Sequence, residues 1–134
     1  DLLIQKEEKR RLYQIIDEEG EEGFKTIENR VNASIDTENT VIATGGSVVY
    51  CSEAMEHLKS IGKVVYLSLS LESRLGNLKK RGVFLKEGQT LKSLYEERVP
   101  LYEKYADIVV DEEGKDLEAS LQALLETLQT GVIK

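Results

Sequence analysis

The sequence is short of the residues that build disulfides, zinc sites and membrane spans. It contains one cysteine, Cys51, and one histidine, His57. A single cysteine excludes an internal disulfide, and with one histidine it leaves too few ligands for a structural zinc site. No apolar run approaches the roughly 18 residues of a membrane-spanning helix. We therefore expect no metal held by side chains of this chain, no membrane partner, and a reducing, cytoplasmic location.

Basic residues are also scarce. The chain has 18 Lys and Arg against 25 Asp and Glu, a net charge of −7. Nucleic-acid binding needs a surplus of basic side chains to neutralise phosphates, so we exclude a nucleic-acid partner. The charge does not exclude a small anionic ligand held by a few local cations. With 134 residues, 40% of them hydrophobic, residues 1–134 have the length and composition of a single domain.

Apolar patterns of strand and helix alternate along the chain. Short apolar runs typical of buried strands are found at 41–44, 63–68 and 107–110. Helical patterns cover 1–17, 21–33, 53–60, 71–78, 91–105 and 117–128, with Gly20 separating the first two. Strands joined by helices predict an α/β fold with a parallel sheet covered by helices on both faces. Three strands make a thin sheet for this class, and the chain opens at Asp1 without an initiator methionine. We expect the first strands of the domain to be absent from this chain.

A glycine pair follows the first expected strand. Gly45 and Gly46 have no Cβ, so a ligand could approach the backbone there, at the strand end where open α/β sheets bind ligands. The alternative is a tight turn that binds nothing. Charged residues favour a ligand: acidic and basic groups in 20–28 together with Asp1, and three arginines at 74, 81 and 98. Each cluster alone is more typical of a solvated surface than of a binding site.

In this order the motifs resemble those of the shikimate kinase family, a branch of the P-loop kinases. Residues 20–28 match Gly-Glu-x-x-Phe-Arg-x-x-Glu, with lysine for the arginine. Residues 44–47 (Thr-Gly-Gly-Ser) match the family's glycine-rich strand end, and 98–102 (Arg-Val-Pro-Leu-Tyr) match Arg-x-Pro-Leu-Tyr. The resemblance covers nearly the whole chain. It implies a P-loop-kinase-like three-layer fold whose first two strands are absent here. It also implies ATP-dependent phosphorylation of shikimate to shikimate 3-phosphate, a step in aromatic amino acid biosynthesis.

The resemblance also implies a small-acid site. Asp1 would bind acceptor hydroxyls close to the one that attacks ATP, and would be catalytic. Lys25 and Arg98 would pair with the acceptor carboxylate. Gly45 and Gly46 would present backbone amides to the acceptor.

Nucleotide binding is implied at two arginines. Arg81 would lie on a mobile lid at 79–89 and reach the transferred phosphate as the second catalytic residue, while Arg74 would stack on adenine. ATP and Mg²⁺ are the implied cofactors. The sequence contains no Gly-x-x-x-x-Gly-Lys-[Ser/Thr] loop, whose amides and lysine bind phosphates and whose hydroxyl binds Mg²⁺. We therefore predict that residues 1–134 are inactive on their own.

Departures from the family pattern leave alternatives open. Lys25 is a point charge where the family has a planar guanidinium, which weakens bidentate carboxylate recognition. Ser47 replaces the family's third glycine. Both residues keep open a kinase for another small polyol or sugar acid. The missing phosphate loop keeps open a non-catalytic acid-binding or regulatory module. The oligomeric state cannot be predicted from the sequence.

Overall fold

The computed structural model describes residues 1–73 and 90–130. The chain divides into two compact units, 1–62 and 63–134, which are described separately. That residues 1–134 form a single domain stays a prediction. The lid expected at 79–89 and most of the helix expected at 71–78 lie outside the described residues.

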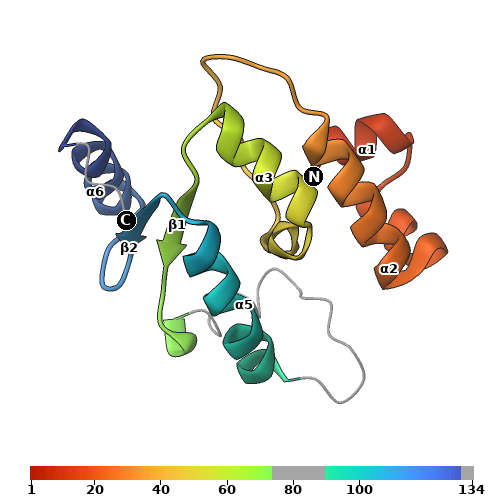
Figure 1. The fold of residues 1–134 in the computed structure, drawn as a ribbon. Helices are drawn as coiled ribbons and strands as arrows, with labels where there is room; N and C mark the ends of the chain where they lie inside the picture. The colour runs from red at the N-terminus through yellow and green to blue at the C-terminus, as the bar shows by residue number, and fades with distance from the viewer. Residues whose placement is uncertain (74–89, 131–134) are drawn as a thin grey trace. The chain divides into compact units, whose positions relative to one another are not determined.

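The first unit is built from helices (Figure 1). They are α1 (Leu2–Glu8), α2 (Leu12–Ala33), the 3-10 helix η1 (Gly46–Tyr50) and α3 (Ser52–Ile61). Apolar residues spaced to fall on one helix face make α1 and α2 pack together. Their core is Ile4, Ile15 and Val31, and Ile15 is fully buried. The helices α3 and η1 also contact α2, so α2 supports every other element of this unit.

Helix α2 bends at Gly20, near its middle. Gly20 has φ 73° and ψ −177°, a conformation outside the helical region that side chains rarely adopt. At Gly23, an added Cβ would lie 2.7 Å from the Cβ of Glu19, too close for any larger residue to fit without a shift. The predicted helix break at Gly20 is confirmed. The helix resumes directly after it, so the two expected helices form one bent element.

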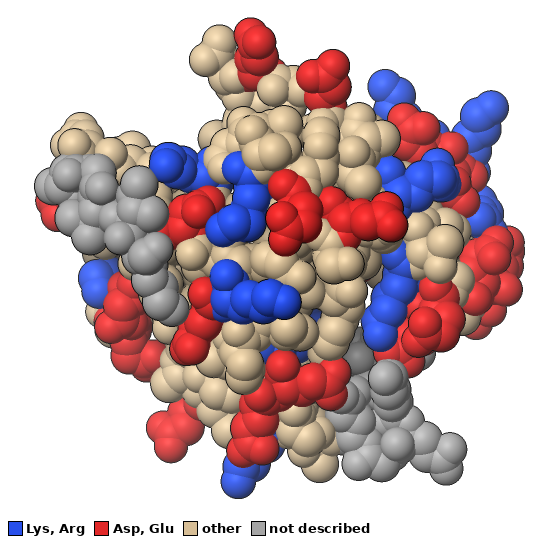
Figure 2. Space-filling model, viewed as in Figure 1, with Lys and Arg blue, Asp and Glu red and all other residues tan. Residues whose placement is uncertain are grey.

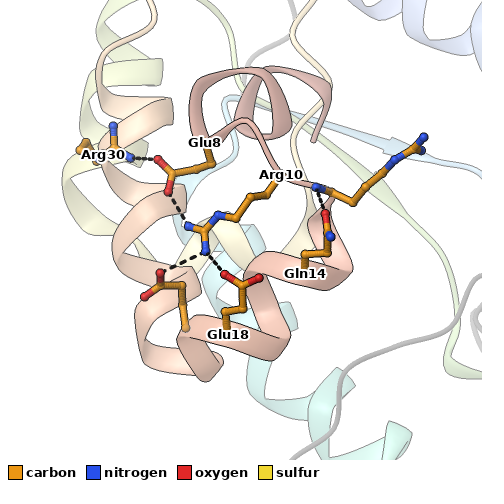
Figure 3. Close-up of polar contacts among 7 residues, drawn as sticks. Glu8, Arg10, Gln14, Glu18 and Arg30 are labelled. Carbon is orange, nitrogen blue, oxygen red and sulfur yellow. Dashed lines mark hydrogen bonds and ion pairs between the residues drawn. The ribbon is translucent and has the colours of Figure 1, made fainter.

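A network of charged side chains joins α1 to both halves of α2 (Figure 3). The two carboxylate oxygens of Glu8 accept hydrogen bonds from Arg10, at 2.9 Å, and from Arg30, at 2.6 Å. The Arg10 guanidinium also contacts Glu18 at 2.7 Å and Glu19 at 3.2 Å. These contacts hold the pKa of Glu8 below its usual value, the Arg10 hydrogen bond contributing most. Glu8 therefore connects the end of α1 with residues from both sides of the bend.

The strand expected at 41–44 is not formed, so this prediction was wrong. Residues 41–44 have no regular secondary structure, and Val41 is 95% exposed. A strand needs a neighbouring backbone to pair with its amides and carbonyls. Among the described residues, none pairs with this segment. The prediction from apolar composition alone therefore gave residues 41–44 a strand that they do not form.

The second unit contains a parallel strand pair. Its elements are β1 (Val65–Ser68), α5 (Leu91–Tyr105), β2 (Ile108–Asp111) and α6 (Leu117–Thr130). Strand β1 pairs with β2 in the register Val65↔Ile108 to Ser68↔Asp111. The α/β class with parallel strands is thereby confirmed, and the strands expected at 63–68 and 107–110 form at nearly those positions.

Helix α5 packs through aromatic residues on this sheet. The Tyr66 ring of β1 lies 5.2 Å from the Tyr102 ring of α5, centroid to centroid. Thr90 caps the helix by accepting a 3.0 Å hydrogen bond from the Ser93 amide. The helix continues through Pro100.

The charged side chains are mixed on the face drawn in Figure 2, where acidic and basic groups lie among neutral ones. Such interspersed charge is typical of a solvated surface. Across residues 1–73 and 90–130, the structure has no helix long and apolar enough to span a membrane.

Candidate functional site

Three segments of the first unit meet at Gly45. A Cβ built on Gly45 would lie 3.5 Å from Oδ1 of Asp1 and 3.5 Å from Oε2 of Glu28. Asp1 is the N-cap residue of α1, Glu28 comes from the second half of α2, and Gly45 directly precedes η1. The distances are ordinary contacts, and the φ of Gly45 is −70°, so the backbone does not require glycine. The missing side chain instead leaves a small space beside two carboxylates.

Glu28 is a charged residue within the core. It is 1% exposed, and its Oε1 accepts a hydrogen bond from the Ser47 hydroxyl at 2.7 Å. A carboxylate taken out of water is tolerated only where hydrogen bonds replace its hydration. Sequence reasoning matched Glu28 to a motif but gave it no role. Its spacing in the sequence could have indicated that it is buried. Glu28 stands four residues after Phe24 and three before Val31, on the apolar face of α2.

Lys25 lies on α2 and contacts groups of its own unit. Its Nζ is 3.2 Å from Oε1 of Glu21 and 4.5 Å from the centroid of the Tyr50 ring in η1. An acceptor carboxylate at Lys25 would therefore share the ammonium with Glu21. The side chain is about one-fifth exposed, at 22%.

Cys51 lies next to these charges and is buried. Desolvation raises the pKa of its thiol to about 11, the Glu28 carboxylate adds to this rise, and Lys25 opposes it. The thiol stays protonated at neutral pH and is a poor nucleophile. Its Sγ contacts the backbone oxygen of Lys25 at 3.6 Å. This environment favours a structural role for Cys51 over a reactive one.

The glycine pair forms the turn into η1. The Val48 amide donates to the Gly45 carbonyl at 3.3 Å, and Gly46 is the first residue of η1. Both glycines lie in the same unit as Asp1 and Lys25. The structure thus brings Asp1, Gly45 and Glu28 together, and Ser47 contacts Glu28.

The predicted arginines are distributed differently. Arg98 belongs to α5 of the second unit, is half-buried, and has a buried Nε atom. Arg74 and Arg81 lie outside the described residues. Their roles, and the pairing of Arg98 with an acceptor, stay predictions.

The binding of ATP and Mg²⁺ implied by the resemblance stays a prediction. Within 1–73 and 90–130, no group of three or more His, Cys, Asp and Glu is placed to hold a metal ion. The sequence lacks the phosphate-binding loop as well.

The parallel strand pair and the helices define an α/β protein. The family model "Shikimate kinase" matches residues 1–129. The chain belongs to the shikimate kinase family, which confirms the resemblance. The shikimate kinase of Dictyoglomus turgidum is 33% identical over 96% of this chain and 80% of its own. That of Francisella tularensis subsp. novicida is 40% identical over 75% of this chain. The match covers 61% of the Francisella relative, so the chain spans about three fifths of its length.

Solved structures give the same result for the fold. A shikimate kinase from Acinetobacter baumannii in complex with shikimate superimposes with a TM-score of 0.80 and 30% identity, covering 100% of this chain and 78% of that one. A shikimate kinase from Bacteroides thetaiotaomicron gives a TM-score of 0.71 over 98% of this chain and 81% of its own. At 22% identity, the second likeness supports the fold alone.

Proposed function

We propose that the protein expressed from its complete gene phosphorylates shikimate with ATP to give shikimate 3-phosphate. The observation that carries this proposal is the pair of carboxylate oxygens, from Asp1 and Glu28, beside the bare backbone of Gly45. Ionised carboxylates accept hydrogen bonds only, so the pair suits a ligand rich in hydroxyl donors. Family membership and the relative solved with shikimate support shikimate as that ligand.

The proposed roles follow from charge and position. Asp1 accepts a hydrogen bond from the attacking hydroxyl and orients it. Lys25 and Arg98 pair with the acceptor carboxylate, and the amides of Gly45 and Gly46 contact the acceptor. Phosphoryl transfer depends mainly on such positioning and on electrostatics, because the protein has little covalent chemistry to perform.

The nucleotide side of the proposal comes from the family. ATP, Mg²⁺, and the roles of Arg74 on adenine and Arg81 on the transferred phosphate are family features, and no described residue carries them. The chemistry that ATP·Mg²⁺ supplies is the transferred phosphoryl group. A cytoplasmic location belongs to the same proposal, on the ground that one cysteine suits a reducing compartment.

The test is turnover by the protein from its complete gene, with the phosphorylated product identified by mass spectrometry. We expect ATP-dependent shikimate 3-phosphate, and a fall in kcat of at least about 100-fold in Asp1→Asn, since positioned acid–base groups contribute about 10²–10⁴ in rate. Asp17→Asn is the matched control, because Asp17 is an exposed aspartate on α2. Equal activity in Asp1→Asn and Asp17→Asn would refute the role of Asp1. Absence of the product in wild type would refute the function.

A second candidate is a kinase for another polyol or sugar acid. The contact of Lys25 with Glu21 favours it, because this ammonium is shared where the family has a guanidinium. A panel of hydroxylated acids, compared by kcat/KM, separates the two candidates. Higher kcat/KM for another acid would select the second. Shikimate binding without turnover would select a non-catalytic binding module.

A further inference from the structure

We propose that Ser47 is a positioning residue of the acceptor site, which fixes the buried Glu28 carboxylate so that one oxygen stays beside Gly45. The inference deepens the proposed function and rests on it for the identity of the acceptor. It gives a role to the serine that stands where the family pattern has its third glycine.

The geometry begins with the hydrogen bond between η1 and α2. The Ser47 hydroxyl donates to Oε1 of Glu28 at 2.7 Å, across 19 residues of sequence. The hydroxyl is partly buried, and the carboxylate is almost fully buried. A short hydrogen bond to an ionised acceptor is stronger than a neutral one, and burial reduces competition from water.

This bond restricts where the second oxygen of Glu28 points. The terminal torsion of a glutamate side chain has a broad energy profile, so the carboxylate group does not orient itself. With Oε1 held by Ser47, Oε2 lies 3.5 Å from the Cβ position of Gly45. Oδ1 of Asp1 lies 3.5 Å from the same point. Ser47 therefore sets the spacing of two hydrogen-bond acceptors, which selects ligands whose neighbouring hydroxyls match it.

A glycine at position 47 could not make this contact. The hydroxyl–carboxylate bond depends on the side chain that distinguishes this chain from the family pattern. No side-chain cap of η1 involves Ser47, because the N-cap residue is Gly45. The hydroxyl thus acts on Glu28 rather than on the start of the 3-10 helix.

The kinetic test compares Ser47→Ala, Ser47→Thr and Ser34→Ala in the protein from its complete gene. Ser34→Ala is the matched control, because the Ser34 hydroxyl donates a bond of similar length, 2.8 Å, to the Val31 carbonyl away from the site. For Ser47→Ala we expect about a tenfold rise in the KM for shikimate, with kcat and the KM for ATP within about twofold. Ser47→Thr retains the hydroxyl and should restore the KM. A purely structural hydroxyl would lower the melting temperature without changing the KM, and that result would overturn the proposal.

A second measurement separates this inference from the proposed function. The side-chain carboxyl ¹³C resonance of Glu28, recorded without ligands, should move or broaden in Ser47→Ala and stay unchanged in Ser34→Ala. If wild type fails to phosphorylate shikimate, the proposed function fails, and the resonance still reports on Ser47. An unchanged resonance in Ser47→Ala would show that Glu28 is held without Ser47, and would refute the positioning role.

Discussion

Glu28 shows how a single side chain links the core to the site. It occupies a position of α2 that an aliphatic residue would otherwise fill, between neighbours of the apolar core. Burying a carboxylate costs free energy that hydrogen bonds must offset. The residue is therefore better explained by its contacts at Gly45 and Ser47 than by packing.

Arg98 carries the prediction at the residue scale. If it pairs with the acceptor carboxylate, Arg98→Ala should raise the KM for the acid at least about tenfold, from loss of a charge-assisted hydrogen bond of roughly 1.5–3 kcal/mol. Initial-rate kinetics on the protein from its complete gene measure this. Lys92→Ala is the control, because Lys92 is an exposed cation on the same helix, near Glu96. A KM unchanged from wild type would contradict the assignment.

From the sequence, only those residues of the candidate site that belong to recognisable motifs could be predicted. The motifs placed Asp1 and the Gly45 turn in one site, and the structure brings them together. The motifs did not include the contact of Lys25 with Glu21, although a glutamate four residues before a lysine on a helix favours such a pair. They also could not show that the Ser47 hydroxyl reaches Glu28, since that contact depends on how η1 packs on α2.

The bend of α2 gives the first prediction for an element. Gly20→Ala forces a side chain into a backbone region that only glycine adopts easily, so it should lower the free energy of unfolding by about 1–3 kcal/mol. Urea denaturation followed by circular dichroism measures the change. Gly62→Ala is the matched control. Gly62 has φ −173° and nothing within 4 Å of an added Cβ, so its replacement should be neutral or slightly stabilising. Equal losses in both variants would argue against strain at Gly20.

The charge network between α1 and α2 predicts a dependence on pH. The folded-state pKa of Glu8 is lowered, so its contribution is present above its unfolded-state pKa and is lost as the pH falls through the folded-state pKa. Glu8→Gln should therefore lower the melting temperature at pH 7, and its difference from wild type should disappear in acid. High salt should also reduce the difference.

Glu7→Gln provides the comparison for this experiment, because Glu7 is an exposed glutamate on the same helix. Thermal melts of both variants between pH 3 and pH 7, a range around the usual carboxyl pKa of about 4, would settle the point. A deficit in Glu8→Gln that persists unchanged at the acid end would show that the carboxylate charge is not its cause.

Sequence patterns predicted the helices better than the strands. The helix at 91–105 is stabilised by its own cap and by hydrogen bonds between residues close in sequence. Its predicted bounds therefore agree with those in the structure. The runs at 41–44 and 63–68 look alike in composition. Among the residues that the structure describes, only the second has a partner strand, since β1 pairs with β2. Such pairing depends on residues far away in the sequence. A local pattern cannot report whether that partner is present.

At the scale of the whole molecule, we predict that the 134-residue chain by itself does not phosphorylate shikimate. The sequence lacks the lysine-bearing phosphate loop, so tight binding of ATP has no basis in its residues. An assay of this chain beside the protein from its complete gene, with ATP, Mg²⁺ and shikimate, measures the difference. Turnover by the 134-residue chain would mean that other residues hold the phosphates.

The pairing of β1 with β2 also sets the order in which the chain can fold. The Val64 amide donates a hydrogen bond to the Asp107 carboxylate, which joins two residues 43 positions apart in the sequence. The pairing of β1 with β2 begins next to it, at Val65 and Ile108. The contacts between α1 and α2 join neighbours in sequence, and such local contacts form sooner than distant ones. The sheet should thus be the slow step of folding. Because closure entropy grows only with the logarithm of loop length, doubling that connection would cost about 0.6 kcal/mol. Insertions between β1 and β2 should delay folding more than they weaken the folded protein.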